Sequence, residues 1–251
     1  MILDLFSLKG KVAIVTGSNT GLGQGICRAY AEAGAKVVGV SRRPSTETEE
    51  LIGKDNFYNV IADLSSTAVL PEVIEKTLAH YGRIDILVNN AGIIKRADSL
   101  DVCEEDWDSV LNVNLKTVFF LTQAVAKQFI KQGSGGKVIN IASMLAYQGG
   151  VRVPSYTASK SAIKGITMTL ANEWAKQGIN VNAIAPGYMA TNNTAQLRSD
   201  EERSGDILAR IPAGRWGTPA DLEGAAVYLA SPASDYVNGF TLAVDGGWLG
   251  R

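Results

Sequence analysis

The segment VPSYTASKSAIKG, residues 153–165, places a tyrosine and a lysine four residues apart among small residues. Pro154 and Ser155 are residues that often begin a helix, so Tyr156 and Lys160 are expected on one face of a helix. A nearby ammonium group favours the phenolate and lowers a tyrosine pKa from its usual value of about 10. The spacing is therefore consistent with Tyr156 as a general acid or base, although the same pair also occurs on ordinary exposed helices.

Further polar residues are expected at the same place. Ser143 follows the apolar run KVINIA, the amide-rich NNAG (89–92) ends another such run, and Asn114 lies within a helical pattern that an amide disfavours. Each has a structural alternative: a turn cap, a loop contact or a helix kink. One shared reaction centre explains them together better than separate structural roles do.

A glycine-rich segment, TGSNTGLGQG (16–25), follows the first apolar run and precedes a helical pattern. Gly17, Gly21 and Gly23 permit a tight turn and a close approach of phosphate groups, and a helix N-terminus offers free N–H groups. This placement predicts a dinucleotide site rather than an ordinary glycine-rich turn.

The residues expected at the ribose end of that site are Ser41, Arg42 and Arg43. An acidic residue there would bind the ribose 2′-hydroxyl of NAD, whereas a guanidinium can pair with the 2′-phosphate of NADP. An arginine at a strand end is also often simply solvated, so these residues permit NADP without requiring it.

The elements that would position these residues alternate along the chain. Apolar runs without strict alternation are separated by segments of helical periodicity, which predicts a doubly wound parallel α/β sheet of about seven strands in a single domain, of Rossmann type. The predicted strands are 11–16, 36–40, 57–62, 84–89, 137–142, 179–185 and 241–245.

The polar stretch near 188–219 follows a predicted strand end. Because ligands of such sheets bind beyond the carboxyl ends of the strands, this stretch is predicted to be a helical insertion that covers the substrate. A solvated helical excursion is the alternative.

Composition excludes several classes of function. The 251 residues are 46% hydrophobic and 20% charged, with a net charge of -1, so nucleic acid and membrane surfaces are not expected partners. MILDLFSLKGK resembles neither a signal peptide nor a membrane span, so a cytoplasmic location is expected. Cys27 is expected as a buried reduced thiol and His80 as a surface residue, and no metal site is predicted.

The sequence resembles the short-chain dehydrogenase/reductase family over its whole length. TGSNTGLG resembles the family's cofactor motif, ADL (62–64) its adenine-contacting motif, NNAG its central-strand motif and PGYMAT (186–191) the segment at the nicotinamide. Asn114, Ser143, Tyr156 and Lys160 match the family's catalytic tetrad. The resemblance implies that Tyr156 exchanges the proton, Ser143 binds the substrate oxygen, Lys160 lowers the tyrosine pKa and binds the ribose, and Asn114 holds a water in a proton relay.

The cofactor is expected to be NAD, with NADP not excluded. The predicted cofactor contacts are Gly17, Asn19, Gly21, Leu22, Gly23, Ser41, Arg42, Asp63, Leu64, Asn90, Ala91, Gly92, Tyr156, Lys160, Pro186, Gly187 and Thr191.

Within the family, RIPAGRWG, SDYVNGFTLAVDGGW and neighbouring segments resemble enzymes of uronate and pectin breakdown. This implies hydride transfer between a nicotinamide cofactor and a secondary alcohol or ketone of a deoxy sugar acid. A gluconate 5-dehydrogenase or a 3-oxoacyl thioester reductase of the same fold is the alternative, and a dinucleotide sensor without turnover is the alternative from another class.

A sugar acid needs a cation or several donors for its carboxylate. Arg152, four residues before Tyr156, is the predicted contact, although a solvent-facing arginine is an equal alternative. The predicted substrate-binding residues are Ser143, Gln148, Arg152, Tyr156, Tyr188 and Met189. A small-residue stripe, Ala158, Ala162, Gly165 and Thr169, permits close helix contact, and the family resemblance favours a homotetramer.

Overall fold

A single sheet of seven parallel strands forms the centre of the molecule, in the order β3-β2-β1-β4-β5-β6-β7. The computed structural model describes residues 1–251. The strands are β1 (Val12–Thr16), β2 (Lys36–Ser41), β3 (Phe57–Ile61), β4 (Ile86–Asn89), β5 (Gly136–Ile141), β6 (Ile179–Pro186) and β7 (Thr241–Val244). The predicted fold class is confirmed, and each predicted run contains a strand, with small differences at the ends.

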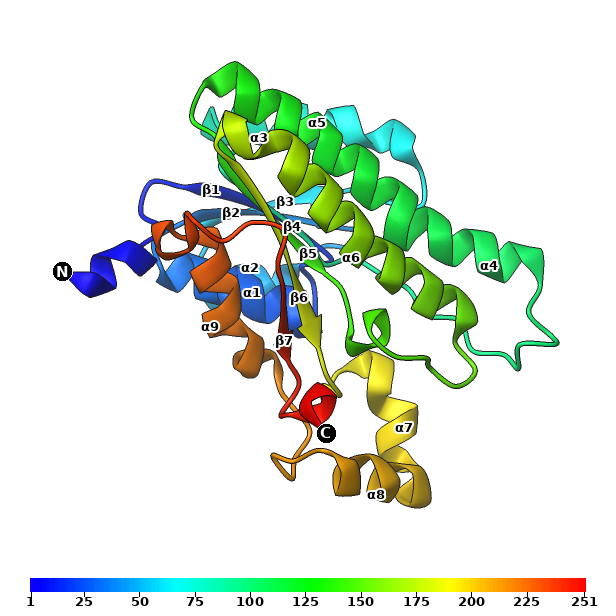
Figure 1. Cartoon of the computed structure of the whole chain (residues 1–251). Helices are drawn as coiled ribbons and strands as arrows, with labels where there is room; N and C mark the ends of the chain where they lie inside the picture. Colours follow the sequence, from blue (N-terminus) through cyan, green and yellow to red (C-terminus); the bar gives the residue numbers. More distant parts are fainter.

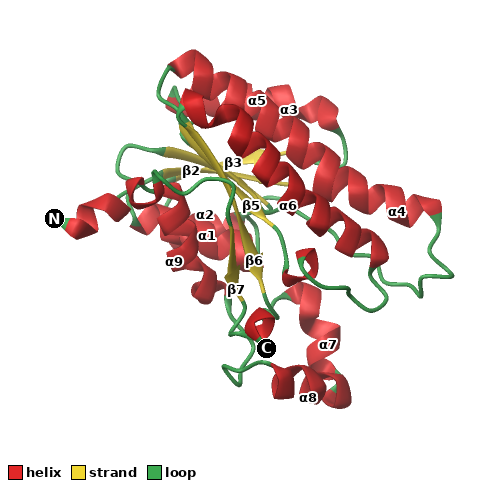
Figure 2. Ribbon diagram, in the orientation of Figure 1, coloured by secondary structure: helices red, strands yellow, loops and turns green.

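Helices cover both faces of this sheet (Figures 1 and 2). One face carries α3 (Leu70–Tyr81), α5 (Thr117–Gln132) and α6 (Pro154–Trp174), and the other carries α1 (Gly21–Glu32), α2 (Thr46–Ile52) and α9 (Pro219–Ala230). The short α4 (Glu104–Leu111) leads into α5. None of the helices combines the length and apolar character needed to cross a membrane.

Burial on both faces explains why the strands are rich in apolar residues without strict alternation. Val12 and Ile14 of β1 pack in the cluster beneath α3, α5 and α6, whereas Ala13 and Val15 pack in the cluster beneath α1 and α9. Each successive side chain of the strand therefore enters a core, so no position favours a polar residue.

The strand order reverses between β1 and β4, which is where ligands of such sheets bind. The loops after these two strands are held together at this point. Thr16 Oγ1 accepts hydrogen bonds from the backbone N–H groups of Asn90 and Ala91, both at 3.0 Å.

The polar stretch after β6 forms two helices, α7 (Ala195–Ser199) and α8 (Glu201–Arg210), after a short helical turn, η6 (Asn192–Thr194). Figure 1 shows both helices beyond the carboxyl ends of β6 and β7, near the C-terminus of the chain. The Arg251 guanidinium donates to the carbonyl of Ala209 at 3.1 Å, which ties the C-terminus to the end of α8.

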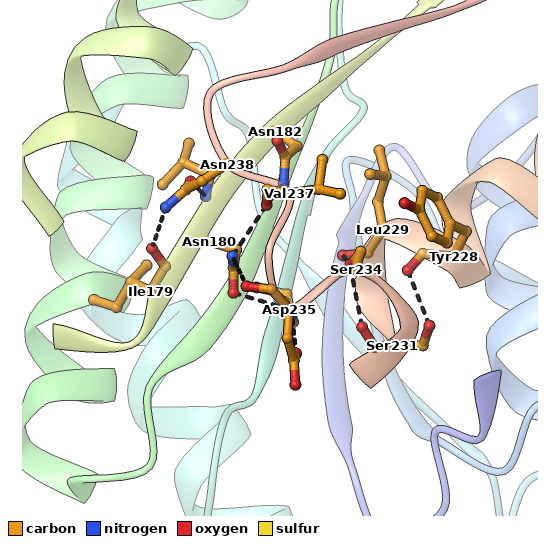
Figure 3. A network of polar contacts seen from close by, with 12 residues as sticks. Ile179, Asn180, Asn182, Tyr228, Leu229, Ser231, Ser234, Asp235, Val237 and Asn238 are labelled. Carbon is orange, nitrogen blue, oxygen red and sulfur yellow. Dashed lines mark hydrogen bonds and ion pairs between the residues drawn. The ribbon is translucent and has the colours of Figure 1, made fainter. Parts of the chain in front are cut away.

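A second polar region lies at the amino ends of β6 and β7 (Figure 3). Asn180, Asn182 and Asn238, here called the amino-end amide network, fasten the loop before β7 to β6. Asn182 donates to the Val237 carbonyl at 2.8 Å and accepts from the Phe240 N–H at 3.0 Å. Asn238 accepts from Val181, and Asn180 donates to two loop carbonyls.

Two residues with reactive side chains lie away from the carboxyl edge of the sheet. Cys27 is fully buried on α1 as a free thiol, and burial raises its pKa, so the predicted inert thiol is confirmed. His80 is exposed at the end of α3, as predicted for a surface residue. Its ring stacks on the Tyr58 ring, with 4.1 Å between the ring centres.

Candidate active site

The glycine-rich turn after β1 needs glycine at three positions, for reasons of backbone conformation or of close packing. Gly17 and Gly21 have positive φ angles of 68° and 58°. A Cβ on Gly23 would lie 2.1 Å from the Gly17 carbonyl oxygen, so only glycine allows this packing of α1 against the turn. The turn leads directly into the N-terminus of α1, so free N–H groups and the helix dipole favour a phosphate group there. These residues fit a dinucleotide.

Asn90 fixes the shape of that turn from the neighbouring strand. Its side-chain amide donates to the carbonyls of Thr16 at 2.9 Å and Gly17 at 3.2 Å. Thr191 closes the opposite side, because a Cβ on Gly21 would lie 3.6 Å from the Thr191 methyl group. The predicted contacts from three separate loops are thus brought together around the turn, with Asn19 and Leu22 partly exposed beside it.

The side chains after β2 divide into buried and free groups. Ser41 is buried, and its hydroxyl donates to the Arg43 carbonyl at 2.6 Å and contacts the Ser45 hydroxyl at 3.0 Å. Arg42 and Arg43 are exposed, and neither guanidinium has a carboxylate partner. The arginines, rather than the serine, are therefore free to meet a ligand.

Asp63 lies close to this group, exposed after β3, and the adjacent Leu64 is buried. The Ser65 N–H donates to Asp63 at 3.0 Å. Hydrogen bonds from Ser65, with a smaller contribution from the Arg42 charge, hold the pKa of Asp63 below its usual value. The carboxylate and a guanidinium thus face the same part of the predicted adenosine site.

Tyr156 and Lys160 share one face of α6, close to its start at Pro154. The Lys160 ammonium lies 5.5 Å from the centre of the Tyr156 ring and donates to the Ile141 carbonyl at 2.6 Å. Lys160 is buried, and Tyr156 is half-buried with the Ser143 hydroxyl beside its own. The phenol is therefore available to a ligand.

Burial controls the protonation of this pair. It raises the pKa of Tyr156, and the Ser143 hydroxyl and the Arg96 charge oppose that effect without reversing it. Burial lowers the pKa of Lys160 to about 8. The sequence predicts a lowered Tyr156 pKa, but the net direction in the structure is upward, because loss of solvent outweighs the nearby charges.

Ser143 and Asn114 complete the predicted group. Ser143 follows β5, and its hydroxyl oxygen accepts from the Leu145 N–H at 3.1 Å, which leaves the O–H free to donate. Asn114 is buried, accepts from the Ile93 N–H at 2.9 Å and donates to the Ile93 carbonyl at 2.9 Å. A Cβ on Gly92 would lie 3.2 Å from Asn114 Oδ1 and 3.8 Å from Lys160 Nζ, so these three residues are neighbours.

The helix that carries Asn114 is interrupted by a π-helical turn, Asn112–Lys116, between α4 and α5. Such turns are frequent at functional sites. Asn114 also donates to Ser159 at 3.2 Å, and Ser159 in turn donates to the Tyr156 carbonyl at 2.7 Å. Sequence reasoning identified an unusual amide in a helix but missed Ser159, which links that amide to the first turn of α6.

The segment after β6 continues toward the same edge. Gly187 follows Pro186, and a Cβ there would lie 2.6 Å from the Asp245 Cα, so the chain passes closely against the end of β7. Tyr188 is half-buried and packs edge-on against Trp248 at 4.9 Å and Trp216 at 5.4 Å. Burial raises the pKa of Tyr188.

Gln148 joins this aromatic cluster to α8. Its side-chain oxygen accepts from the Trp248 indole N–H at 3.1 Å and from Arg210 at 3.4 Å. The Arg210 guanidinium also lies 4.2 Å from the Trp248 ring centre. Sequence reasoning missed both tryptophans and Arg210, because no local pattern indicates that segments so far apart meet.

Two predicted substrate contacts lie away from the group around Tyr156. Met189 is buried in the core beneath α1 and α9, against Gly217, so its side chain faces the core. Arg152 has a positive φ of 62°, and its side chain is 60% exposed and paired with Asp98 at 3.3 Å. The structure does not bring these two side chains into the group around Tyr156.

Comparison with known proteins gives consistent relatives. The family model described as enoyl-(acyl carrier protein) reductase matches residues 17–249. The chain is 62% identical to the 2-dehydro-3-deoxy-D-gluconate 5-dehydrogenase of Dickeya dadantii, over 100% of both chains.

Solved structures agree with this result. An Agrobacterium tumefaciens protein assigned as a 2-deoxy-D-gluconate 3-dehydrogenase, with bound NADP, matches with a TM-score of 0.93 and 55% identity over 98% of this chain and 99% of that one. A gluconate 5-dehydrogenase of Burkholderia cenocepacia, in complex with NADP and tartrate, matches with a TM-score of 0.94 and 39% identity over 100% of both chains.

Proposed function

The chain belongs to the short-chain dehydrogenase/reductase family of NAD(P)-dependent oxidoreductases, and we propose that it interconverts the secondary alcohol and the ketone at carbon 5 of 2-dehydro-3-deoxy-D-gluconate. Relatives of that name match the whole chain, and a more distant relative was crystallised with tartrate, another hydroxy acid. The enzyme would serve the breakdown of uronates and pectin.

The observation that carries this proposal is the free phenol of Tyr156 beside Ser143 and Lys160 at the carboxyl edge of the sheet. Its hydroxyl lies beside the Ser143 hydroxyl, and neither hydroxyl donates to any other group of the chain. A substrate oxygen placed between these two hydroxyls would receive a hydrogen bond from each.

The proton moves through Tyr156 in this mechanism. Its raised pKa keeps the phenol protonated at neutral pH, which suits donation to a ketone oxygen. In the oxidation direction Tyr156 must first lose its proton, so the oxidation rate is expected to rise with pH as the phenolate fraction grows. Ser143 stabilises the developing negative charge on the substrate oxygen.

Lys160 and Asn114 support this proton transfer. One Lys160 N–H is used by the Ile141 carbonyl, which leaves two for the cofactor ribose and for a water. Both N–H groups of the Asn114 side chain are used, so the side chain holds the Gly92 loop, and we assign any contact with a relay water to its main-chain carbonyl.

The chain's own residues would hold the dinucleotide along the crevice between β1 and β4. The turn of Gly17, Gly21 and Gly23 would receive the pyrophosphate, Asp63 the adenine and Thr191 the nicotinamide end. Bound there, the nicotinamide supplies the hydride acceptor or donor. We propose that NAD and NADP are both accepted, because Arg42 and Arg43 have no carboxylate partner.

An absorbance assay at the nicotinamide band tests the proposal. Purified protein is given each cofactor with 2-dehydro-3-deoxy-D-gluconate, 2-deoxy-D-gluconate, D-gluconate and a 3-oxoacyl thioester. The expected result is highest kcat/KM for the first acid. Preference for gluconate or the thioester would replace this substrate by one of the other family substrates, and binding of cofactor with no turnover of any compound would favour a dinucleotide sensor.

We also propose that α7 and α8 cover the bound substrate and that four copies assemble. The stripe Ala158, Ala162, Gly165 and Thr169 leaves α6 with little side-chain bulk. Beside it, a groove of about 710 Å³ between α4, α5 and α6 is lined by five apolar residues, among them Phe119 and Phe120, and by four polar or charged ones. A second copy packed here would bury this surface, and light scattering after size exclusion would report the tetramer.

We further propose a cytoplasmic location. Cys27 and Cys103 are both free thiols, which fits a reducing compartment. Cell fractionation followed by an activity assay tests this location, and activity outside the cytoplasmic fraction would contradict it.

A further inference from the structure

The loop after β3, residues 63–65, is bonded to the π-helical turn between α4 and α5. The Thr117 hydroxyl donates to the Leu64 carbonyl at 2.9 Å, and the Asn112 side-chain amide donates to the Ser65 carbonyl. Asn112 begins the turn, and Thr117 directly follows its last residue. The two ends of the π-helical turn are therefore fastened to consecutive carbonyls of one loop.

The bond made by Thr117 is protected from solvent. Thr117 is 2% exposed, and Leu64 is buried in the core beneath α3, α5 and α6. Breaking this bond would leave a hydroxyl and a carbonyl without water to replace the lost partner. The bond therefore fixes the distance between the loop and the start of α5.

The same loop is the predicted adenine contact. Asp63 is exposed and accepts from the Ser65 N–H at 3.0 Å, while the Ser65 carbonyl accepts from Asn112. The Ala62 N–H donates to the Ser41 carbonyl at 3.0 Å, which joins this loop to the end of β2. A ligand on Asp63 thus contacts a loop whose other side holds the π-helical turn.

The middle of the turn belongs to the candidate active site. Asn114 lies between the two fastened ends and bonds both backbone groups of Ile93. It also donates to Ser159, whose hydroxyl donates to the Tyr156 carbonyl at 2.7 Å. One short segment of backbone therefore connects the adenosine end of the site with the first turn of α6.

This connection gives the adenosine half of the cofactor a way to affect the reacting end. Adenosine takes no part in hydride transfer, but the binding energy of a remote group can be used to order groups at the reacting centre. A π-helical turn interrupts the regular helical repeat, so bonds from outside the helix help to set the position of its side chains.

We propose that Thr117 and Asn112 are positioning residues that couple adenosine binding to the position of Asn114, an inference that rests on the dinucleotide site and the dehydrogenase activity proposed above. Adenosine at Asp63 orders the loop after β3, and the two bonds transmit this order to the π-helical turn. Asn114 then holds the loop after β4 and the start of α6 in the arrangement that the reaction requires.

Hydrogen–deuterium exchange with adenosine 5′-monophosphate (AMP) tests the coupling without turnover, because AMP lacks the nicotinamide half of the cofactor. In the wild type, AMP should slow amide exchange about fivefold or more in residues 63–66 and in residues 112–117. In Thr117→Val the first effect should remain and the second should be lost. Thr117→Ser keeps the hydroxyl and should restore it, and Asn112→Ala should weaken it from the other end of the turn.

Steady-state kinetics with the whole dinucleotide and 2-dehydro-3-deoxy-D-gluconate give the second readout. Thr117→Val should lower kcat about fivefold, as expected for one lost hydrogen bond, with KM for the cofactor within about twofold of wild type. Thr77→Val is the matched control, because Thr77 is also fully buried but its hydroxyl donates to Val73 within α3. This control should keep the wild-type kcat and the wild-type response to AMP.

The coupling is overturned if AMP protects residues 63–66 of the wild type but not residues 112–117. It is also overturned if Thr117→Val and Asn112→Ala keep the full response, or if Thr77→Val loses it equally. AMP that fails to bind the wild type in calorimetry, or binds without protecting residues 63–66, overturns the proposed dinucleotide site itself, so the two failures are distinguishable.

Discussion

Asparagine, serine and charged side chains gather at both ends of the sheet, with opposite results. In the amino-end amide network, Asn182 and Asn238 each use both the donor and the acceptor of the amide on backbone groups (Figure 3). At the carboxyl edge, the Tyr156 hydroxyl has only the Ser143 hydroxyl beside it, and Arg96 uses one donor of five.

This difference separates side chains that hold the fold from side chains that meet ligands. A buried amide whose bonds are all made stabilises the loop it fastens, and its loss leaves buried backbone groups unpaired. A polar group left without partners beside a crevice contributes little to folding and remains available for binding. Asn114 shows that position alone is insufficient, because it lies at the carboxyl edge yet its amide is saturated by Ile93 and Ser159.

The largest effect is expected for Tyr156→Phe, which removes only the free hydroxyl. Turnover should fall by about 10³-fold, within the range attributed to general acid–base catalysis, while cofactor binding persists. The free energy of unfolding should change by no more than about 1 kcal/mol, because the Ser143 hydroxyl is the one hydrogen-bonding neighbour lost. Tyr236→Phe, at a fully exposed tyrosine, is the matched control for kcat. A strongly destabilised Tyr156→Phe protein would contradict the distinction between side chains that hold the fold and side chains that meet ligands.

The reverse result is expected at the other end of the sheet for Asn182→Ala. The Val237 carbonyl and the Phe240 N–H lose their partner, so the free energy of unfolding should fall by about 2–4 kcal/mol in denaturant titrations. The folded protein should keep kcat within about twofold of wild type. Asn193→Ala, at an exposed amide without side-chain bonds, should leave stability unchanged. If Asn182→Ala lowered kcat at full stability, the amide network would have a functional role.

Local sequence patterns were sufficient for the fold and for much of the site. Seven runs rich in apolar residues predicted seven strands, because burial on both faces favours apolar side chains at most strand positions. The glycine spacing and the spacing of Tyr156 and Lys160 are likewise local. The parallel sheet then brings the ends of these elements to one edge.

The remaining features depend on contacts between distant segments. Arg152 and Arg96 are both exposed arginines of loops, and only the folded chain shows that the first is paired with Asp98 and the second has no acidic partner. The direction of the Tyr156 pKa also follows from burial, which residue spacing does not report. The meeting of Trp248 with Tyr188 has the same tertiary origin.

Lys160 combines the two regions' properties, since it is buried like the amide network yet charged like the catalytic edge. Its pKa of about 8 lies below that of an exposed lysine, so the unfolded chain binds more protons than the folded one between about pH 8 and 10.5. Stability conferred by this site therefore rises as pH increases across that window and is lowest below pH 8.

Lys160→Met should consequently raise the free energy of unfolding by about 1–2 kcal/mol at pH 7, with loss of turnover. The gain should shrink as pH approaches 10.5, because the lysine of the folded wild type is then neutral and its burial no longer costs the desolvation of a charge. Thermal or denaturant unfolding across this pH range measures the effect, with the exposed Lys54→Met as control. A destabilised variant at pH 7 would mean that the bond to the Ile141 carbonyl outweighs the cost of the buried charge.

Arg42→Ala is expected to give the smallest effect, because Arg42 is exposed and pairs with no carboxylate. Losing an exposed contact to the 2′-phosphate should reduce kcat/KM for NADP about fivefold, or ~1 kcal/mol, and leave the value for NAD nearly unchanged. Raising the salt concentration should narrow the difference in kcat/KM for NADP between the wild type and Arg42→Ala, since exposed charges are screened. Arg43→Ala provides the matched comparison one residue along the same loop. An equal loss with both cofactors would show that Arg42 supports the adenosine site as a whole, for example through Asp63. In that case a cation without a carboxylate partner would stabilise the local structure instead of binding the ligand.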